Sequence, residues 1–217
     1  MNRRILFLTF LLVTIISCKK EKETVPDPIP VVPKEEIIEI KTSFGTMYMW
    51  LNKKTPKHRA NFIKLAGEKF YDSTTFHRCV TNFVIQGGDP LTKDSDPSND
   101  GNGGPGYLID AEIDTAKYKH DYGAVGTARL PNTTNPERKS NGSQFYIVTQ
   151  TGGSHGLDNE YSVIGKIIKG MDVALTINKQ AKNVNGKPNV NIYMDVNLLL
   201  KTQAEITSEF GYSDFTW

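Results

Sequence analysis

The sequence is poor in cysteine, with only Cys18 and Cys79 among its 217 residues. Two cysteines form at most one disulfide, so a small scaffold held together by several bridges is excluded. A hydrophobic content of 38% is instead typical of a globular domain that is stable through its core. Cys79 lies in the apolar run from Phe76 to Val80, and we expect it to be a buried small side chain, not a reactive thiol.

The sequence also lacks an excess of charge of one sign. Its formal net charge is +2, and without residues 1–17, which contain Arg3 and Arg4, the balance is zero because 24 basic side chains face 24 acidic ones. A nucleic-acid surface needs clustered, excess Lys and Arg. We therefore expect no nucleic-acid partner.

Patterns of metal ligands are missing as well. The four histidines have no paired ligand spacing. The segment from Asp96 to Gly101 is similar to the first half of a calcium loop, but its twelfth position falls on Tyr107, where a bidentate Glu is required. We expect no metal and no cofactor.

No apolar run is long enough to cross a bilayer as a mature helix. The run from Ile5 to Ile16 has 12 residues, whereas a spanning helix needs about 20. A basic n-region precedes it, and this order is typical of a targeting signal that is removed.

The end of this signal, Ile-Ile-Ser-Cys at residues 15–18, resembles a bacterial lipobox. The resemblance implies cleavage after Ser17 and acylation of Cys18. Several acyl chains, at about 0.8 kcal/mol per buried methylene, would anchor the protein stably. Lys19 is not the aspartate that marks inner-membrane retention in some bacteria, so we expect a place in the cell envelope at the outer membrane, on its periplasmic or its surface face. The alternative is a plain secretory signal, although no better site of the Ala-x-Ala type is present.

Composition divides the chain into four segments. Residues 1–17 are predicted to be a lipoprotein signal peptide, and residues 18–34 are predicted to be a lipidated cysteine with a proline-rich tether. The tether favours polyproline II, and at about 3.1 Å per residue it reaches at most roughly 45 to 50 Å. Residues 35–201 are the predicted folded domain, and residues 202–217 are an aromatic tail that we expect to pack on that domain.

Short strand-like runs dominate the folded region. Ile37 to Ile40 and Met47 to Leu51 flank a turn and predict a hairpin, and further runs occur at 76–80, 83–86, 125–130, 144–149, 161–168 and 190–200. Thr55-Pro56 predicts the start of a helix that ends at Gly67, and a second short helix is expected over 171–178. Many strands with only two helices predict an all-β sandwich or closed barrel.

Several motifs in one order resemble the cyclophilin signature. They lie between residues 35 and 200 and comprise Phe-His-Arg-Cys-Val at 76–80, Phe-Val-Ile-Gln-Gly-Gly-Asp-Pro at 83–90, Gly-Gly-Pro-Gly-Tyr at 103–107, Asn-Gly-Ser-Gln-Phe-Tyr-Ile at 141–147, Leu-Asp at 157–158 and Gly-Met-Asp-Val at 170–173. The resemblance implies a closed eight-stranded antiparallel barrel with two capping helices and a groove outside its wall. It also implies a peptidyl-prolyl cis-trans isomerase, expected to be a monomer whose partners are proline-containing polypeptides.

Carried over position by position, the resemblance implies a set of site residues. The catalytic positions fall on Arg78, Phe83 and Gln86. The substrate-binding positions fall on Val84, Ala128, Gln144, Tyr146 and Leu157, and Phe83, Val84, Tyr146 and Leu157 would line the proline pocket.

These residue types suit the chemistry. Rotation about an X-Pro bond loses amide resonance, with a barrier of about 18 to 20 kcal/mol, so a catalyst must bind the twisted amide best. Twisting frees the lone pair of the proline nitrogen, and a permanently charged guanidinium such as that of Arg78 can donate a hydrogen bond to it. The alternatives are a non-catalytic module that binds proline-containing segments and a structural envelope protein. Arg78 favours the enzyme, because a binder needs no such donor.

The sequence departs from the family pattern at several positions. Val84 stands where methionine is common, Ile164 replaces a usual phenylalanine, and Gly156 stands where relatives carry Trp, His or Phe. Without that aromatic rim we expect cyclosporin to bind weakly. Two loops, 91–102 and 129–140, are long, and the second should border the groove.

Overall fold

The computed structural model describes residues 32–114 and 116–215. The predicted signal peptide, Cys18 and almost all of the tether lie outside the described residues. No helix within the described ranges is long and apolar enough to cross a membrane.

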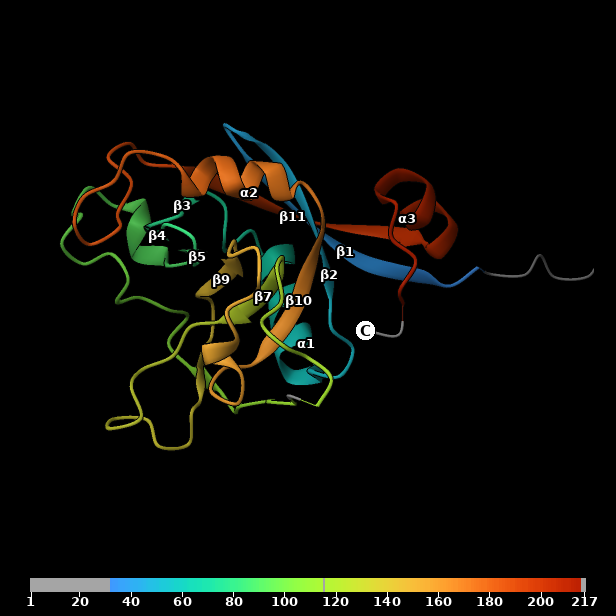
Figure 1. Cartoon of the computed structure of the whole chain (residues 1–217), viewed down its shortest axis with the longest axis horizontal. Helices are drawn as coiled ribbons and strands as arrows, with labels where there is room; N and C mark the ends of the chain where they lie inside the picture. Colours follow the sequence, from blue (N-terminus) through green and yellow to red (C-terminus); the bar gives the residue numbers. More distant parts are fainter. Residues whose placement is uncertain (1–31, 115, 216–217) are drawn as a thin grey trace, which may run out of the picture. The chain divides into compact units, whose positions relative to one another are not determined.

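The described chain is built on antiparallel strands (Figure 1). Nine of them form one sheet in the order β3-β11-β1-β2-β10-β7-β9-β5-β4. Their bounds are Lys34–Thr42 (β1), Gly45–Leu51 (β2), Thr74–Thr75 (β3), Arg78–Val80 (β4), Val84–Gly87 (β5), Ala124–Thr127 (β7), Phe145–Val148 (β9), Val163–Lys169 (β10) and Tyr193–Thr202 (β11). A separate pair joins β6 (Leu108–Ile109) to β8 (Ser140–Asn141).

The all-β prediction is confirmed, and the sheet curls strongly into a half-barrel. The closed eight-stranded barrel is not confirmed. The sheet has nine strands, its order ends at β3 and β4, and no ladder joins these two within the described residues. The strand expected at 76–80 is interrupted at Phe76 and His77. The segment 74–80 forms two separate strands, β3, which pairs with β11, and β4, which pairs with β5.

The predicted hairpin is β1 with β2. Gly45 turns the chain with φ at 126°, a conformation that side chains with a Cβ rarely adopt. Successive side chains of a strand point to opposite faces of the sheet, and those of β2 are divided between the two faces in this way. Met47 and Met49 enter the main core, while Trp50 enters a smaller cluster on the other face.

Both predicted helices are present. Helix α1 (Pro56–Gly67) begins with the expected proline, but the side chain of Thr55 does not cap it. The carboxylate of Glu112, far along the chain, accepts hydrogen bonds from the backbone N–H groups of Lys57 and His58, each at 3.0 Å. Helix α2 (Met171–Asn178) packs against β2 and β5. The described residues also form two 3-10 turns, η1 (Pro90–Lys93) and η2 (His155–Leu157).

A third helix, α3 (Gln203–Phe210), is absent from the sequence-based prediction. It begins with a capping box between Thr202 and Glu205. The aromatic side chains that follow pack back on the sheet, as expected for the tail: Phe210 stacks on Tyr48 and Phe215 meets Trp50 edge to face. Trp217 lies outside the described residues.

The other end of the sheet carries a second apolar cluster on its outer face. Alternate residues of β5 and β9 point in opposite directions, so Ile85 and Ile147 join the main core. Val84, Tyr146 and Val148 instead form the outer cluster, against which Phe83, Leu157 and Tyr161 pack. The candidate site lies over this cluster.

Candidate active site

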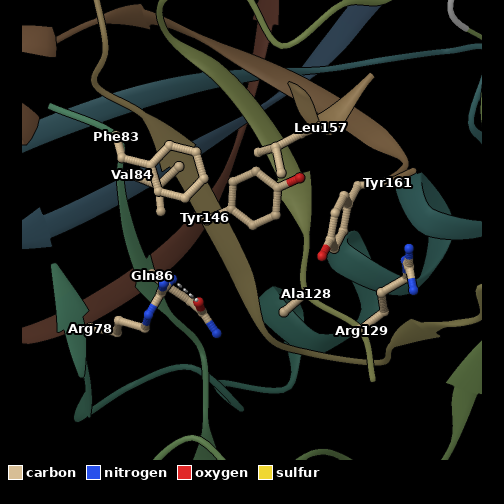
Figure 2. Close-up of a pocket in the computed structure, with 9 residues that line it drawn as sticks. All are labelled: Arg78, Phe83, Val84, Gln86, Ala128, Arg129, Tyr146, Leu157 and Tyr161. Atoms are coloured by element: carbon tan, nitrogen blue, oxygen red, sulfur yellow. Dashed lines mark hydrogen bonds between the residues drawn. The ribbon is translucent and has the colours of Figure 1, made fainter. Parts of the chain in front are cut away.

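A cavity of about 270 Å³ opens over β5 and β9. Figure 2 shows the nine residues that line it, which are Arg78, Phe83, Val84, Gln86, Ala128, Arg129, Tyr146, Leu157 and Tyr161. Seven of the eight residues predicted from the sequence are among them. The eighth, Gln144, lines an adjoining cavity of about 470 Å³, which shares Gln86, Ala128 and Arg129 with the first.

Sheet register explains how the first residues come together. Arg78 on β4 lies opposite Gln86 on β5, Gln86 lies opposite Tyr146 on β9, and Tyr146 lies opposite Gly126 on β7. Directly opposed residues of neighbouring strands point to the same face. The four positions therefore form one row across the outer face, with the cation at the edge strand and the aromatic ring near the centre.

Glutamine side chains hold Arg78 from one side. The Nη1 of Arg78 donates to Oε1 of Gln86 at 3.3 Å, and Nε2 of Gln86 donates to Oε1 of Gln144 at 3.0 Å. Nε2 of Gln144 in turn donates to the backbone carbonyls of Gly101 and Gly103, at 2.9 and 2.8 Å. Since a carbonyl can only accept, the orientation of Gln144 is determined, and with it that of Gln86. These hydrogen bonds through Gln86 and Gln144, here called the glutamine chain, therefore present an acceptor to Arg78. They leave the other donors of the guanidinium for a ligand.

An apolar recess lies beside this cation. Val84 and Tyr146 are buried and form its floor, while Phe83 and Leu157 are partly buried at its sides. These are the four residues predicted to bind the proline ring. A recess of this composition binds an apolar ring and excludes water.

The hydroxyl of Tyr146 is bound beneath the recess. It lies 2.8 Å from Nε2 of His120, whose Nδ1 lies 2.9 Å from Oδ1 of Asp158. Because a carboxylate only accepts, Nδ1 of His120 carries the proton, and in the neutral ring Nε2 accepts from the tyrosine. Gly126 makes this possible, since a Cβ there would lie 2.5 Å from the tyrosine oxygen.

Burial governs the ionisation of this network. It lowers the pKa of His120, against the opposing effect of Asp158. Burial disfavours the Asp158 carboxylate too, but hydrogen bonds from the backbone and ring of His120 and from His155 outweigh it and lower the pKa of Asp158. His120 is thus held neutral and Asp158 charged at neutral pH.

Two lining residues, Arg129 and Tyr161, were not predicted as site residues. Arg129 directly follows Ala128, and Tyr161 opens the strand expected at 161–168, so both positions were recognisable. Their role depends on a contact between segments 32 positions apart, which neither local pattern reveals. The expectation that loop 129–140 borders the groove is confirmed, because Arg129 lines both cavities and Leu130 lines the second.

Other predicted positions fall outside the cavity. Cys79 is buried, as expected, and burial raises the pKa of its thiol to about 11, which disfavours the reactive thiolate at neutral pH. Gly156 is exposed on η2, and a Cβ there would meet nothing within 4 Å. Cys18, the predicted lipidation site, lies outside the described residues.

Comparison with known proteins agrees with this geometry. The family model described as cyclophilin type peptidyl-prolyl cis-trans isomerase/CLD matches residues 37–196. Peptidyl-prolyl cis-trans isomerase B of Bacillus subtilis is 39% identical over 53% of this chain and 70% of its own length, and peptidyl-prolyl cis-trans isomerase cypE of Dictyostelium discoideum is 34% identical over 71% and 91%.

A solved structure has the same fold. The cyclophilin type peptidyl-prolyl cis-trans isomerase of Cryptosporidium parvum is 28% identical, with a TM-score of 0.66 over 76% of this chain and 98% of that chain. The same isomerase was also solved in the presence of the dipeptide Ala-Pro. The match covers the strands and loops that build the cavity, and we conclude that this chain belongs to the family of cyclophilin-type peptidyl-prolyl cis-trans isomerases.

Proposed function

We propose that this isomerase acts on X-Pro bonds of exported or envelope proteins and assists their folding, from a lipid anchor at Cys18 in the cell envelope. The isomerase domain supports the reaction, and the solved relative with Ala-Pro supports proline-containing peptides as ligands. The targeting signal and lipobox at residues 1–18 support the location. The single observation that carries the reaction is Arg78, held by Gln86 beside an apolar recess.

In this mechanism the recess binds the proline ring and Arg78 acts on the amide. Phe83, Val84, Tyr146 and Leu157 enclose the ring, so that the part of the peptide before the proline rotates. As the amide twists, its nitrogen becomes pyramidal and accepts a hydrogen bond from Arg78. The bond is stronger in the twisted state than in either planar state, which is the condition for lowering the barrier.

The glutamine chain prepares Arg78 for this task. Its acceptor fixes one donor of the guanidinium before substrate binds, so less side-chain freedom is lost during the reaction. The planar fork still has donors for the nitrogen and for a neighbouring carbonyl. No covalent bond forms or breaks, and no proton is transferred.

The anchor is tested with the full chain in a bacterial host. Cys18→Ala removes the thiol that accepts the lipid, so the protein should move from the membrane fraction to the soluble fraction and change its electrophoretic mobility. Cys79→Ala is the matched control, because this cysteine is buried in the domain, and it should remain at the membrane. A Cys18→Ala protein that stays in the membrane fraction with unchanged mobility would contradict the lipoprotein proposal.

The substrate class is tested with purified proteins. An exported protein whose refolding is limited by a proline should refold faster with the wild-type chain than with Arg78→Ala. Equal rates, with a model peptide still turned over by the wild type, would contradict folding assistance and leave the isomerase activity intact.

A further inference from the structure

One wall of the cavity is the ring of Tyr161. The ring lies edge to face with Tyr146, with centroids 5.9 Å apart and planes at 85°. The guanidinium carbon of Arg129 lies 4.5 Å from the Tyr161 centroid, and Figure 2 shows it on the side of the ring away from Tyr146. Tyr161 is therefore held between the recess and a cation.

Arg129 is itself fixed by hydrogen bonds around its edge. Its Nε donates to the backbone carbonyl of Glu160 and its Nη2 to the Glu160 carboxylate, both at 2.8 Å. Nη1 donates to Oδ1 of Asn132 at 2.7 Å and to the carbonyl of Leu130 at 3.0 Å. All these acceptors lie at the edge of the guanidinium and leave its face for the aromatic ring. Its side chain is only 5% exposed.

Burial makes this contact stronger than a surface pair. A cation–π contact is worth more when water is excluded, and the Glu160 carboxylate compensates the charge of Arg129. Lysine could not replace arginine here, because an ammonium has neither the planar fork nor a flat face for stacking.

We propose that Arg129, oriented by Glu160, is a positioning residue that fixes the Tyr161 ring as a wall of the cavity and so sets the affinity for the proline ring. The proposal deepens the proposed function and rests on it for the identity of the ligand. The competing role is structural: Arg129 would only attach loop 129–140 to the segment that contains Leu157 and Tyr161.

Arg138 separates these two roles. It lies in the same loop and also reaches that segment, with Nη1 donating to the carbonyl of Asn159 at 2.6 Å and Nη2 lying 3.4 Å from the Glu160 carboxylate. It does not line either cavity. Arg138→Gln thus weakens the attachment of the loop without removing support from Tyr161, and it is the matched control for Arg129→Gln.

The test measures KM and kcat for a proline peptide by exchange spectroscopy. Arg129→Gln should raise KM about threefold to tenfold, the range that one cation–π contact allows. Its kcat should stay within about twofold, because a wall that binds planar and twisted states alike changes affinity only. Arg138→Gln should leave both constants unchanged. An equal rise in KM in the two variants, or a loss confined to kcat, would overturn the proposal.

A double-mutant cycle with Tyr161→Leu tests whether Arg129 acts through the ring. In the Tyr161→Leu background, Arg129→Gln should raise KM no further. Additive effects would overturn the proposal. Arg129→Lys is measured in the same way, and it should resemble the glutamine variant if stacking matters; KM at the wild-type value in a folded lysine variant would contradict the role of the planar group.

Peptide dissociation constants from NMR titration keep this test separate from turnover. If the wild type binds the peptide without isomerising it, the proposed function fails. A larger dissociation constant in Arg129→Gln, but not in Arg138→Gln, would still support the positioning role. Amide spectra of each variant report folding. If Arg129→Gln does not fold, the lysine variant and Tyr161→Leu provide the comparison.

Discussion

Replacing Arg78 with alanine should remove a large part of the catalysis while leaving the fold intact. A hydrogen bond to a charged group contributes about 1.5 to 3 kcal/mol, and each factor of ten in rate corresponds to about 1.36 kcal/mol. One such bond therefore supplies about 10- to 150-fold, and we expect kcat/KM to fall by about two orders of magnitude. The rest of the rate enhancement comes from binding of the ring and exclusion of water.

The structure also predicts a small effect on stability. Arg78 is only partly buried, it lies on the edge strand β4, and its described hydrogen bond is to Gln86 at 3.3 Å. Its removal leaves no core cavity, so the free energy of unfolding should change by no more than about 0.5 kcal/mol. Arg138→Ala, a partly exposed arginine outside the cavity, is the control and should keep full activity.

Exchange spectroscopy on a proline peptide measures this directly, because it reports cis-trans turnover at equilibrium without a coupling protease. Arg78→Lys should recover only part of the loss, since it restores a charge but not the fork. Full activity in a folded Arg78→Ala protein would refute the mechanism. Absence of activity in the wild type would favour the alternative of a module that only binds proline-containing segments.

The remaining predictions concern inhibition, pH and packing. Cyclosporin should bind weakly to the natural chain, and Gly156→Trp should strengthen binding about tenfold or more. One aromatic contact contributes roughly 1 to 3 kcal/mol, and a side chain at position 156 has open space. Calorimetry that shows tight binding without the tryptophan and no gain with it would contradict the match of Gly156 to the aromatic position of the family. Burial lowers the pKa of His58 and of His120 below 6.5, so the stability that comes from their neutral forms is complete above pH 6.5 and is lost as the pH falls through their folded pKa values. Urea unfolding at a series of pH values should show this loss, and His120→Gln should make the free energy of unfolding depend less steeply on pH. An unchanged pH dependence would assign the effect to other groups. Phe83→Ala should weaken peptide binding and lower the free energy of unfolding, because Phe83 packs on the outer cluster. A peptide titration and a urea unfolding curve that both match the wild type would contradict its place in the recess.

Local signals predicted most of the elements. Thr55-Pro56 and Gly67 bound a helix in the structure as they do in the sequence, and the alternation in Met47 to Leu51 gives a strand with two packed faces. Helix α3 was not predicted, although Thr202 and Glu205 form a capping box at its start. That box is a local signal, and it could have been found.

Contacts over long separations were harder to predict. Motif positions placed Arg78, Gln86 and Tyr146 in the site, and sheet register brings them into one row. The cap that Glu112 provides for α1 and the stacking of Arg129 on Tyr161 have no sequence pattern, because each joins surfaces that meet only in the folded chain. The closed barrel was likewise implied only by the resemblance, and the structure has β3 and β4 as separate strands at the two ends of the sheet order.

The direction of the glutamine chain has a consequence for variation of this gene. A single-nucleotide change converts a glutamine codon into a glutamate codon, and the two side chains have nearly the same shape. At position 144, however, the acid would place a negative oxygen against the carbonyls of Gly101 and Gly103, where an N–H group now donates. The difference of one atom, an N–H group against an oxygen, therefore makes Gln144→Glu unfavourable here, although the same exchange is mild at most surface sites.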